Sequence, residues 1–369
     1  MDIGLPKEIK NHEYRVGMTP IAVKTLVAHG HKVVVQSQAG AKIGFTDAMY
    51  HEAGAKIVKT SKEVYQSEMV IKVKEPQPSE FPLLQEGQVL FCYLHLAPDP
   101  EQTKQLLQKK IIGIAYETVT DVHHHLPLLV PMSEVAGRIS IQVGATYLQI
   151  ANGGKGVLLG GIPGVKPGKV VVLGGGVVGA EAMRMALGLG AEVIIFDRNL
   201  SRLRELDRFH APALRTMYST PAAIEEEIQN ADLIIGAVLI PGKTAPKLIT
   251  KKMLSLMEPG TVIVDVAIDQ GGACETSRPT SHSEPTFILD GIVHYCVTNM
   301  PAACAKTSTQ GLTNATLPYA IKLADLGYRK ALLEDPYFLQ GLNVCFGRVT
   351  NHEVAVDLGY EYVAPEKIL

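Results

Sequence analysis

Short apolar runs alternate with helical patterns along the first third of the chain. We expect strands at five apolar runs, which span residues 2–5, 31–36, 69–73, 88–93 and 111–115. Helical patterns separate these runs at residues 21–29, 47–53 and 99–109, and Thr19-Pro20 gives the first helix an N-cap followed by a proline at its first position. Strands that alternate with helices predict a parallel α/β sheet.

A second pattern occupies residues 169–197, KVVVLGGGVVGAEAMRMALGLGAEVIIFD. It predicts a buried strand at 169–173, a glycine turn of the form G-x-G-x-x-G, a helix that continues over 180–189 and a second buried strand at 191–196. Gly174 permits a tight turn, Gly176 lets backbone N–H groups approach a pyrophosphate, and Gly179 lets the helix pack closely on the strand. The alternative is a plain structural turn, but the strands, the helix and the terminal Asp197 together favour a dinucleotide-binding βαβ unit.

The remaining segments extend this organisation. Residues 131–150 have the pattern of a long helix that passes from one domain to the other, and the glycine-rich stretch 151–168 is typical of a connecting loop. We expect further strands at 231–239, at 261–267 with Asp269 at its end, and at 292–298, and mainly helices over 301–369. The hypothesis is therefore an α/β protein of two Rossmann-like domains with parallel sheets: a discontinuous first domain of residues 1–130 and 306–369, and a nucleotide domain of residues 131–305.

Length and composition agree with two soluble domains. The chain has 369 residues, of which 46% are hydrophobic, and a net charge of −2, which gives no case for nucleic acid or an anionic membrane as a partner. No stretch reaches the roughly 18 uninterrupted apolar residues of a membrane helix. The five cysteines are scattered without a CxxC pair, which suggests reduced thiols and a cytoplasmic location.

Four polar features fall where a core or a loop does not need them. Arg15 can hold a carboxylate through paired hydrogen bonds, although a solvated loop arginine is the alternative. Lys72 and Lys74 end a predicted strand and would share one face of it, so either could be a site lysine or a charged strand edge. His95 follows a strand and could exchange protons near neutral pH, although a lone histidine is more often structural. Asp269 could face a cofactor or could cap a turn.

Two further features bear on ligands. The triplet His123-His124-His125 has no acidic or thiol partner at a suitable spacing, so we interpret it as an exposed loop and expect no metal site. Asp197 would accept hydrogen bonds from a ribose diol and would repel a 2′-phosphate, which favours NAD over NADP, while the adjacent Arg198 could soften that preference.

The motifs together resemble those of the bacterial L-alanine dehydrogenases along nearly the whole chain. The resemblance rests on GLPKEIKNHEYRV, IKVKEP, YLHLAP, IAYETV, PMSEVAGR, the glycine loop, DLIIGAVLIPG, VIVDVAIDQGG, VTNMPA and KTSTQGLTNATLPY. It implies two α/β domains that close over a cleft, and an NAD-dependent oxidative deamination of L-alanine to pyruvate and ammonium. It also implies a homo-oligomer, usually a hexamer. The alternative is a non-catalytic nucleotide-binding subunit of the transhydrogenase type, since transhydrogenases share this fold family.

The resemblance also implies a role for individual residues. Arg15 and Lys74 would bind the substrate carboxylate and carbonyl, and His95 and Asp269 would be the catalytic residues. The cofactor residues that it implies, together with the glycines of the turn, are Ser133, Gly174, Gly176, Val177, Val178, Gly179, Asp197, Arg202, Ser219, Val238, Leu239, Val266, Ala267, Ile268, Asp269, Arg278, Val297, Thr298, Asn299 and Met300.

Overall fold

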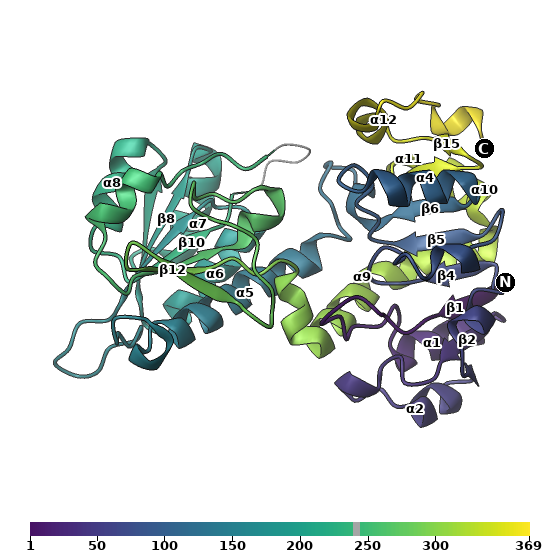
Figure 1. Ribbon diagram of the computed structural model, residues 1–369, viewed down its shortest axis with the longest axis horizontal. Helices are drawn as coiled ribbons and strands as arrows, with labels where there is room; N and C mark the ends of the chain where they lie inside the picture. The colour runs from purple at the N-terminus through teal and green to yellow at the C-terminus, as the bar shows by residue number, and fades with distance from the viewer. Residues whose placement is uncertain (239–243) are drawn as a thin grey trace. The chain divides into compact units, whose positions relative to one another are not determined.

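The computed structural model describes residues 1–238 and 244–369. Its chain forms two compact units (Figure 1): unit 1 comprises Met1–Met132 and Ala305–Leu369, and unit 2 comprises Ser133–Cys304. Each unit has its own sheet and its own hydrophobic core. The two units are defined by their internal contacts, so the expected boundaries of independently folding domains stay a prediction.

Unit 1 is built on an eight-stranded sheet in the order β15-β14-β6-β5-β4-β1-β2-β3. The strands are β1 (Asp2–Leu5), β2 (Lys32–Gln36), β3 (Lys56–Val58), β4 (Met69–Ile71), β5 (Val89–Cys92), β6 (Ile112–Ala115), β14 (Leu342–Cys345) and β15 (Arg348–Val349). From β3 to β6 all pairs are parallel, and their order is the 3-2-1-4-5-6 of a doubly wound fold. β14 then pairs antiparallel with β6, and β15 antiparallel with β14.

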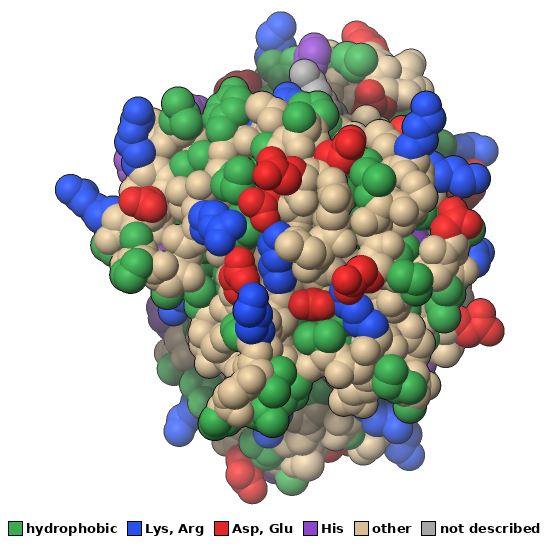
Figure 2. Space-filling model, turned by 90° about the vertical axis from the view of Figure 1, so that its left-hand side faces the viewer, with side chains coloured by type: hydrophobic (Ala, Val, Ile, Leu, Met, Phe, Trp, Pro, Cys, Tyr) green, Lys and Arg blue, Asp and Glu red, His purple; other side chains and the backbone are tan. Residues whose placement is uncertain are grey.

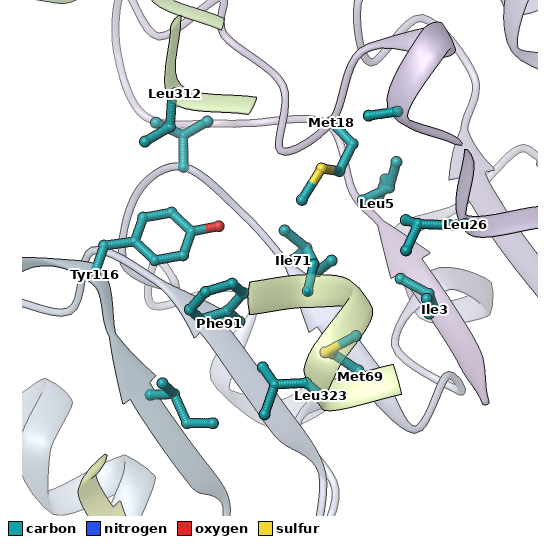
Figure 3. Close-up of a cluster of buried hydrophobic side chains, with 14 of the residues drawn as sticks. Ile3, Leu5, Met18, Leu26, Met69, Ile71, Phe91, Tyr116, Leu312 and Leu323 are labelled. Atoms are coloured by element: carbon teal, nitrogen blue, oxygen red, sulfur yellow. The ribbon is translucent and has the colours of Figure 1, made fainter. Parts of the chain in front are cut away.

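Helices cover both faces of this sheet. On one face, side chains of α1 (Pro20–Ala28) and α9 (Ala305–Leu326) pack on the strands, where Ile3, Ile71 and Phe91 are fully buried (Figure 3). On the other face, α4 (Pro100–Gln108) and α12 (His352–Leu358) pack against Val70 and Leu90. Adjacent strand residues thus point to opposite faces, both apolar, which explains why the strands appear in the sequence as unbroken apolar runs. The remaining helices of unit 1 are α2 (Asp47–Glu52), α3 (Ser61–Val64), α10 (Tyr328–Leu333) and α11 (Pro336–Leu339).

Unit 2 repeats the same order for its first five strands, and its seventh strand, β13, takes the sixth position. Its seven-stranded sheet runs β12-β13-β11-β10-β7-β8-β9. The strands are β7 (Lys169–Leu173), β8 (Glu192–Asp197), β9 (Leu214–Tyr218), β10 (Leu233–Gly236), β11 (Val262–Asp265), β12 (Thr286–Leu289) and β13 (Ile292–Tyr295). All pairs are parallel except β12 with β13.

The helices of unit 2 are α5 (Val130–Tyr147), which begins in unit 1, α6 (Val177–Gly188), α7 (Leu200–His210) and α8 (Pro221–Ile228). Residues of α5 and α6 pack with Val170 and Val172 on one face of the sheet, and residues of α8 pack with Val171 and Leu173 on the other. On the face of the molecule shown in Figure 2, basic and acidic side chains are interspersed, in keeping with the net charge of −2.

The α/β fold class with two parallel-dominated sheets is confirmed, as is the cap at Thr19, whose hydroxyl accepts the N–H of Ala22 at 3.3 Å. The expectation for the C-terminal region was incomplete, because β14 and β15 lie among its helices. The expected strand end near Asp269 was wrong, because β11 ends at Asp265 and a 3-10 turn, Val266–Gln270, follows it. β10 is also shorter than the expected 231–239.

Candidate functional site

The sheet of unit 1 has a topological switch point between β1 and β4. Ligands of open α/β sheets bind outside the carboxyl ends of the strands at such a point. The chain segments that leave β1 at Leu5 and β4 at Ile71 carry Arg15 and Lys74, and the neighbouring β5 leads to His95. The three residues of unit 1 that we expect to bind or react with the substrate therefore all follow the carboxyl ends of neighbouring strands in one sheet.

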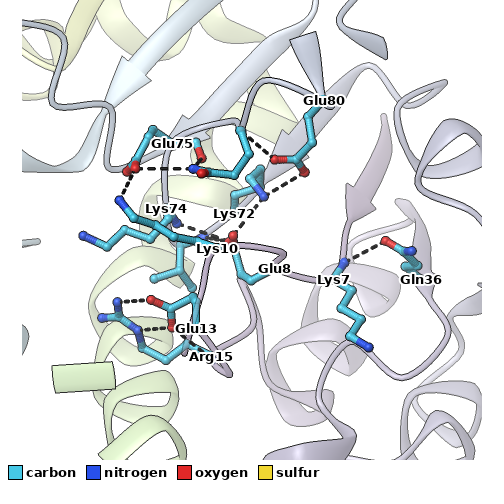
Figure 4. Close-up of polar contacts among 12 residues, drawn as sticks. Lys7, Glu8, Lys10, Glu13, Arg15, Gln36, Lys72, Lys74, Glu75 and Glu80 are labelled. Carbon is cyan, nitrogen blue, oxygen red and sulfur yellow. Dashed lines mark hydrogen bonds and ion pairs between the residues drawn. The ribbon is translucent and has the colours of Figure 1, made fainter. Parts of the chain in front are cut away.

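The structure distinguishes the two lysines that the sequence left equivalent. Lys72 is fully buried, and its Nζ donates to Glu8 at 2.9 Å and to Glu80 at 3.1 Å (Figure 4). Burial alone would lower the pKa of Lys72, but the two carboxylates raise it well above its usual value, so the side chain is a fixed cation. Lys74 is partly exposed, and its backbone N–H donates to Glu8 at 3.2 Å. Lys72 is thus a structural ion, and Lys74 is the lysine that can meet a ligand.

Arg15 already has a carboxylate partner inside the protein. Its Nε and Nη2 donate to the two oxygens of Glu13 at 2.7 and 2.6 Å, and its Nη1 lies 3.0 Å from Sδ of Met132. The side chain is only 2% exposed. The paired hydrogen bonds that we expected for a substrate carboxylate are therefore made to Glu13, and a ligand would approach the Nη1 side.

His95 follows β5 and is exposed, with 44% of its side-chain surface accessible. Its ring stacks on the buried ring of Tyr93, with the centroids 5.8 Å apart and an angle of 5° between the planes. Its backbone φ of +46° lies in the left-handed region, which is unusual for a residue other than glycine. The imidazole is thus held at the edge of the sheet with access to a ligand, as a proton-exchanging group requires.

In unit 2, the two aspartates of the VIVDVAID segment have different environments. Asp265 ends β11, is fully buried and accepts hydrogen bonds from the N–H groups of Ala273 and Cys274 and the hydroxyl of Ser277. Asp269 lies in the following 3-10 turn and is exposed. Asp265 therefore holds the loop that presents Asp269, and the catalytic role of Asp269 stays a prediction.

In the glycine turn after β7, Gly174 and Gly179 have a steric reason, and Gly176 leaves space for a ligand. Gly174 has a φ of +107°, and a Cβ there would lie 2.8 Å from the carbonyl oxygen of Ala237. A Cβ on Gly179 would lie 1.8 Å from the oxygen of Gly174, so only glycine allows α6 to pack here. Around Gly176, the N-cap of α6, a Cβ would meet no atom within 4 Å, and no side chain caps the helix. The first N–H groups of α6 therefore face open space, which suits a phosphate.

Asp197 ends β8 beside this turn. Its Oδ2 accepts the N–H of Gly175 at 2.7 Å and its Oδ1 the N–H of Asn199 at 2.7 Å. Arg202 supports the same turn, since its Nε donates to the oxygen of Gly175 at 2.7 Å, and the N–H of Ser219 donates to the backbone oxygen of Asp197 at 3.0 Å. A carboxylate fixed next to uncapped helix amides fits the ribose and pyrophosphate of a dinucleotide.

Helix α5 approaches the same helix terminus through a glycine that the sequence reasoning did not single out. A Cβ on Gly137 would lie 2.3 Å from the oxygen of Val178 and 2.9 Å from Cβ of Glu181. Arg138 then donates through Nε to Glu181 at 2.6 Å. Ser133 lies one helical turn before Gly137, on the same side of α5, which is consistent with its expected phosphate contact.

The other expected cofactor residues occupy the segments after β10, β11 and β13. Arg278 is exposed and lies over the ring of Phe287, 4.4 Å from its centroid. Asn299 has a φ of +59°. Leu239 lies outside the described residues. Val177 is exposed, Val238, Val266 and Thr298 are partly buried, and Ala267, Ile268, Val297 and Met300 are buried.

Sequence reasoning missed a set of carboxylates that hold the expected site residues in place. They are Glu8 behind Lys74, Glu13 on Arg15, Glu117 on the turn of His95 and Asp265 in the loop of Asp269. Glu8 and Glu13 lie in a segment that is rich in basic residues, and Asp265 lies in an apolar one. An acidic residue inside a buried apolar run, as in VIVD, was the available signal.

The described residues include neither a metal-binding cluster nor a membrane-spanning helix. They contain no group of three or more histidine, cysteine or acidic side chains arranged to hold a metal ion. Within the same residues, we find no helix with the length and apolarity to cross a membrane.

Comparison with family models and known proteins assigns the chain to a family. Residues 4–136 match the model described as the N-terminal domain of Alanine dehydrogenase/PNT, and residues 140–352 match its C-terminal domain. The chain belongs to the alanine dehydrogenase/PNT family. The predicted resemblance is thus confirmed.

The relatives match over the full length of the chain. The chain is 54% identical to an alanine dehydrogenase of Halomonas elongata, with 100% of each sequence covered. It is 52% identical to one of Bacillus subtilis, with 100% of this chain and 98% of the relative covered. A solved L-alanine dehydrogenase aligns with a TM-score of 0.95 at 52% identity, over 97% of this chain and 99% of the other. A transhydrogenase from Sinorhizobium meliloti shares the fold, with a TM-score of 0.83 at 22% identity, over 95% of this chain and 100% of the other.

These comparisons confirm that the protein is an enzyme, an amino-acid dehydrogenase. They favour this interpretation over the non-catalytic, transhydrogenase-type alternative, because identity above 50% over the whole chain is found with the dehydrogenases. The family also implies a pyridine nucleotide as cofactor. The geometry of the glycine turn fits such a nucleotide.

Proposed function

We propose that the protein catalyses the reversible, NAD-dependent oxidative deamination of L-alanine to pyruvate and ammonium. The observation that carries the proposal is the 54% identity to an alanine dehydrogenase along the complete chain. It is supported by the position of Arg15, Lys74 and His95 at the switch-point edge of unit 1.

Arg15 and Lys74 bind and orient the substrate in this proposal. The Nη1 group of Arg15 donates to the substrate carboxylate in place of its contact with Met132. Lys74 places an ammonium group beside the carbonyl oxygen of pyruvate and stabilises negative charge there. Because both side chains come from segments that Glu8 and Glu13 hold rigidly, the α-carbon is fixed without reorganisation of the site.

His95 moves the protons of the reaction. Deamination needs a base to activate water for addition to the α-carbon of the imine, and then an acid to protonate the departing amine. One imidazole can serve both steps near neutral pH, with a contribution of about 10²–10⁴-fold. Its exposed position at the end of β5 gives it access to both the substrate and water.

A nicotinamide nucleotide bound by unit 2 would supply the acceptor for the hydride of the alanine α-carbon. Unit 2 would hold its phosphates at the first turn of α6 and its ribose at Asp197. A fixed carboxylate at the end of β8 disfavours a 2′-phosphate, so we propose NAD rather than NADP. Arg198 is exposed beside it and is the residue that could weaken this preference.

The test is the formation of reduced nucleotide with a panel of amino acids, with NAD and NADP compared at equal concentration. We expect a rate with L-alanine and NAD that far exceeds the rates with larger amino acids and with NADP. No reaction with L-alanine would reject the proposed activity, and comparable rates with NADP would reject the proposed cofactor. The variant His95→Ala should lose turnover while it still binds NADH. A hexameric assembly and a cytoplasmic location stay predictions from the sequence.

A further inference from the structure

The side-chain carboxylate of Glu117 accepts hydrogen bonds from backbone amides of the turn that carries His95. Glu117 stands in a 3-10 turn, Tyr116–Thr118, directly after β6, the strand next to β5. Its Oε1 accepts the N–H of His95 at 2.6 Å, and both of its oxygens lie within 3.2 Å of the N–H of Leu94. One carboxylate thus binds two successive amides of the turn. Charge-assisted hydrogen bonds of this kind are among the stronger ones in proteins.

These bonds hold an unfavourable backbone conformation. His95 has a φ of +46°, and the left-handed region costs a residue other than glycine about 1–3 kcal/mol. Only 15% of the Glu117 side chain is exposed, so water competes little for the hydrogen bonds that this carboxylate accepts from the turn. The carboxylate therefore fixes the direction in which residue 95 projects its side chain.

The same carboxylate also faces the imidazole. Oε1 of Glu117 lies 3.7 Å from Nδ1 of His95, within ion-pair range, and the ring is held flat against Tyr93. The two side chains form no hydrogen bond at this distance, but catalytic contacts are often long before substrate binds and shorten in the reactive complex. A carboxylate beside Nδ1 favours the tautomer that carries its proton on that nitrogen. Nε2 is then the nitrogen that exchanges protons with the substrate.

We propose that Glu117 is the positioning residue of His95: it holds the left-handed turn through two backbone amides, and it orients the imidazole through Nδ1. Nothing in this role brings Glu117 to the substrate itself. The role rests on the proposed function, because it concerns the residue to which we assign proton exchange.

The experiment compares Glu117→Gln with the wild-type protein. Glutamine keeps the size of the side chain and one acceptor oxygen, so the fold is retained while the charge beside Nδ1 is lost. We expect kcat for L-alanine to fall by about 10–100-fold, as for a misplaced catalytic group, with KM and the dissociation constant of NADH close to the wild-type values.

Asp47 offers a matched control within unit 1. It also holds a left-handed residue, since its Oδ1 accepts the N–H of Gln38 at 2.8 Å and Gln38 has a φ of +65°, and it accepts the hydroxyl of Ser37 at 2.6 Å. Asp47→Asn should therefore lower the melting temperature while kcat and KM stay at the wild-type values. A purely structural Glu117 would behave in the same way as Asp47.

The results divide clearly. Wild-type kcat in Glu117→Gln would overturn the proposal, as would a loss of kcat no larger than that of Asp47→Asn. If the glutamine variant does not fold, Glu117→Asp decides: a lowered kcat with wild-type KM supports the role, and wild-type kcat overturns it. Absence of NADH formation from L-alanine by the wild-type protein would count against the proposed function instead, so the two failures are distinguishable.

Discussion

The pair Lys72 and Lys74 offers the sharpest test of the structure, because two identical side chains two residues apart have opposite environments. Lys72 is fully buried between Glu8 and Glu80, and Lys74 is partly exposed at the same strand end. We expect Lys72→Met to damage stability and Lys74→Met to damage catalysis.

The size of the stability effect follows from burial. Methionine in place of Lys72 leaves two carboxylates, 1% and 3% exposed, without their shared counter-ion. The loss of one partner of a buried ion pair costs about 3–5 kcal/mol. A domain of about 150–250 residues loses about 2–4 °C per kcal/mol, so unit 1 should melt about 6–20 °C lower. Lys74→Met removes a partly exposed cation and should change stability by about 1 kcal/mol or less.

The assay is thermal unfolding followed by calorimetry, together with NADH formation from L-alanine. Lys74→Met should unfold close to the wild-type temperature but lose most of its turnover. Lys72→Met, measured well below its melting temperature, should keep measurable turnover with a raised KM, because Glu8 would then hold the backbone of Lys74 less firmly. Equal melting temperatures for the two variants would refute the assignment of Lys72 as a structural ion. Full turnover in Lys74→Met would refute the choice of substrate lysine.

Two further predictions follow from the same edges of the sheets. Gly176→Ala should leave stability unchanged, since its Cβ meets no atom within 4 Å, but should weaken NAD binding by about tenfold (about 1.4 kcal/mol), as measured by titration. The control is Gly188→Ala, which is equally unobstructed at the other end of α6. Equal affinities of the two variants for NAD would refute the phosphate site. Burial alone would raise the pKa of Glu75, but Lys74 and Lys10 lower it below 4.5, so this carboxylate stabilises the fold at neutral pH and the contribution is lost as the pH falls through its folded pKa. Glu75→Gln should therefore be less stable than wild type at pH 7, with a difference that shrinks below about pH 4.5 in denaturant titrations; a difference independent of pH would contradict this.

Features encoded by local rules were predictable from the sequence. The N-cap at Thr19 followed by Pro20 starts α1 at the expected residue, and the strand–glycine–helix pattern gave β7 and α6 because Gly174 and Gly179 have a local steric purpose. Buried parallel strands appear as apolar runs whatever their neighbours, so the fold class was accessible as well.

Features that depend on distant partners were not predictable. Lys72 and Lys74 are equivalent in sequence, and only the position of Glu8, more than 60 residues away, decides which is buried. The guanidinium of Arg15 was expected to be open to a ligand, but Glu13 takes its paired donors. β14 was missed because it is a short strand whose partner in the parallel part of the sheet, β6, is distant in the sequence.

This pairing has a consequence for how the polypeptide matures. Unit 2 is one continuous stretch, Ser133–Cys304, whereas unit 1 needs β14, which lies more than 220 residues after its partner β6. On a translating ribosome, unit 2 can therefore complete its sheet while unit 1 still waits for its last strands to be synthesised. The order of emergence thus leaves the edge of β6 unpaired for most of synthesis, so nascent unit 1 is the part that should depend on chaperone protection.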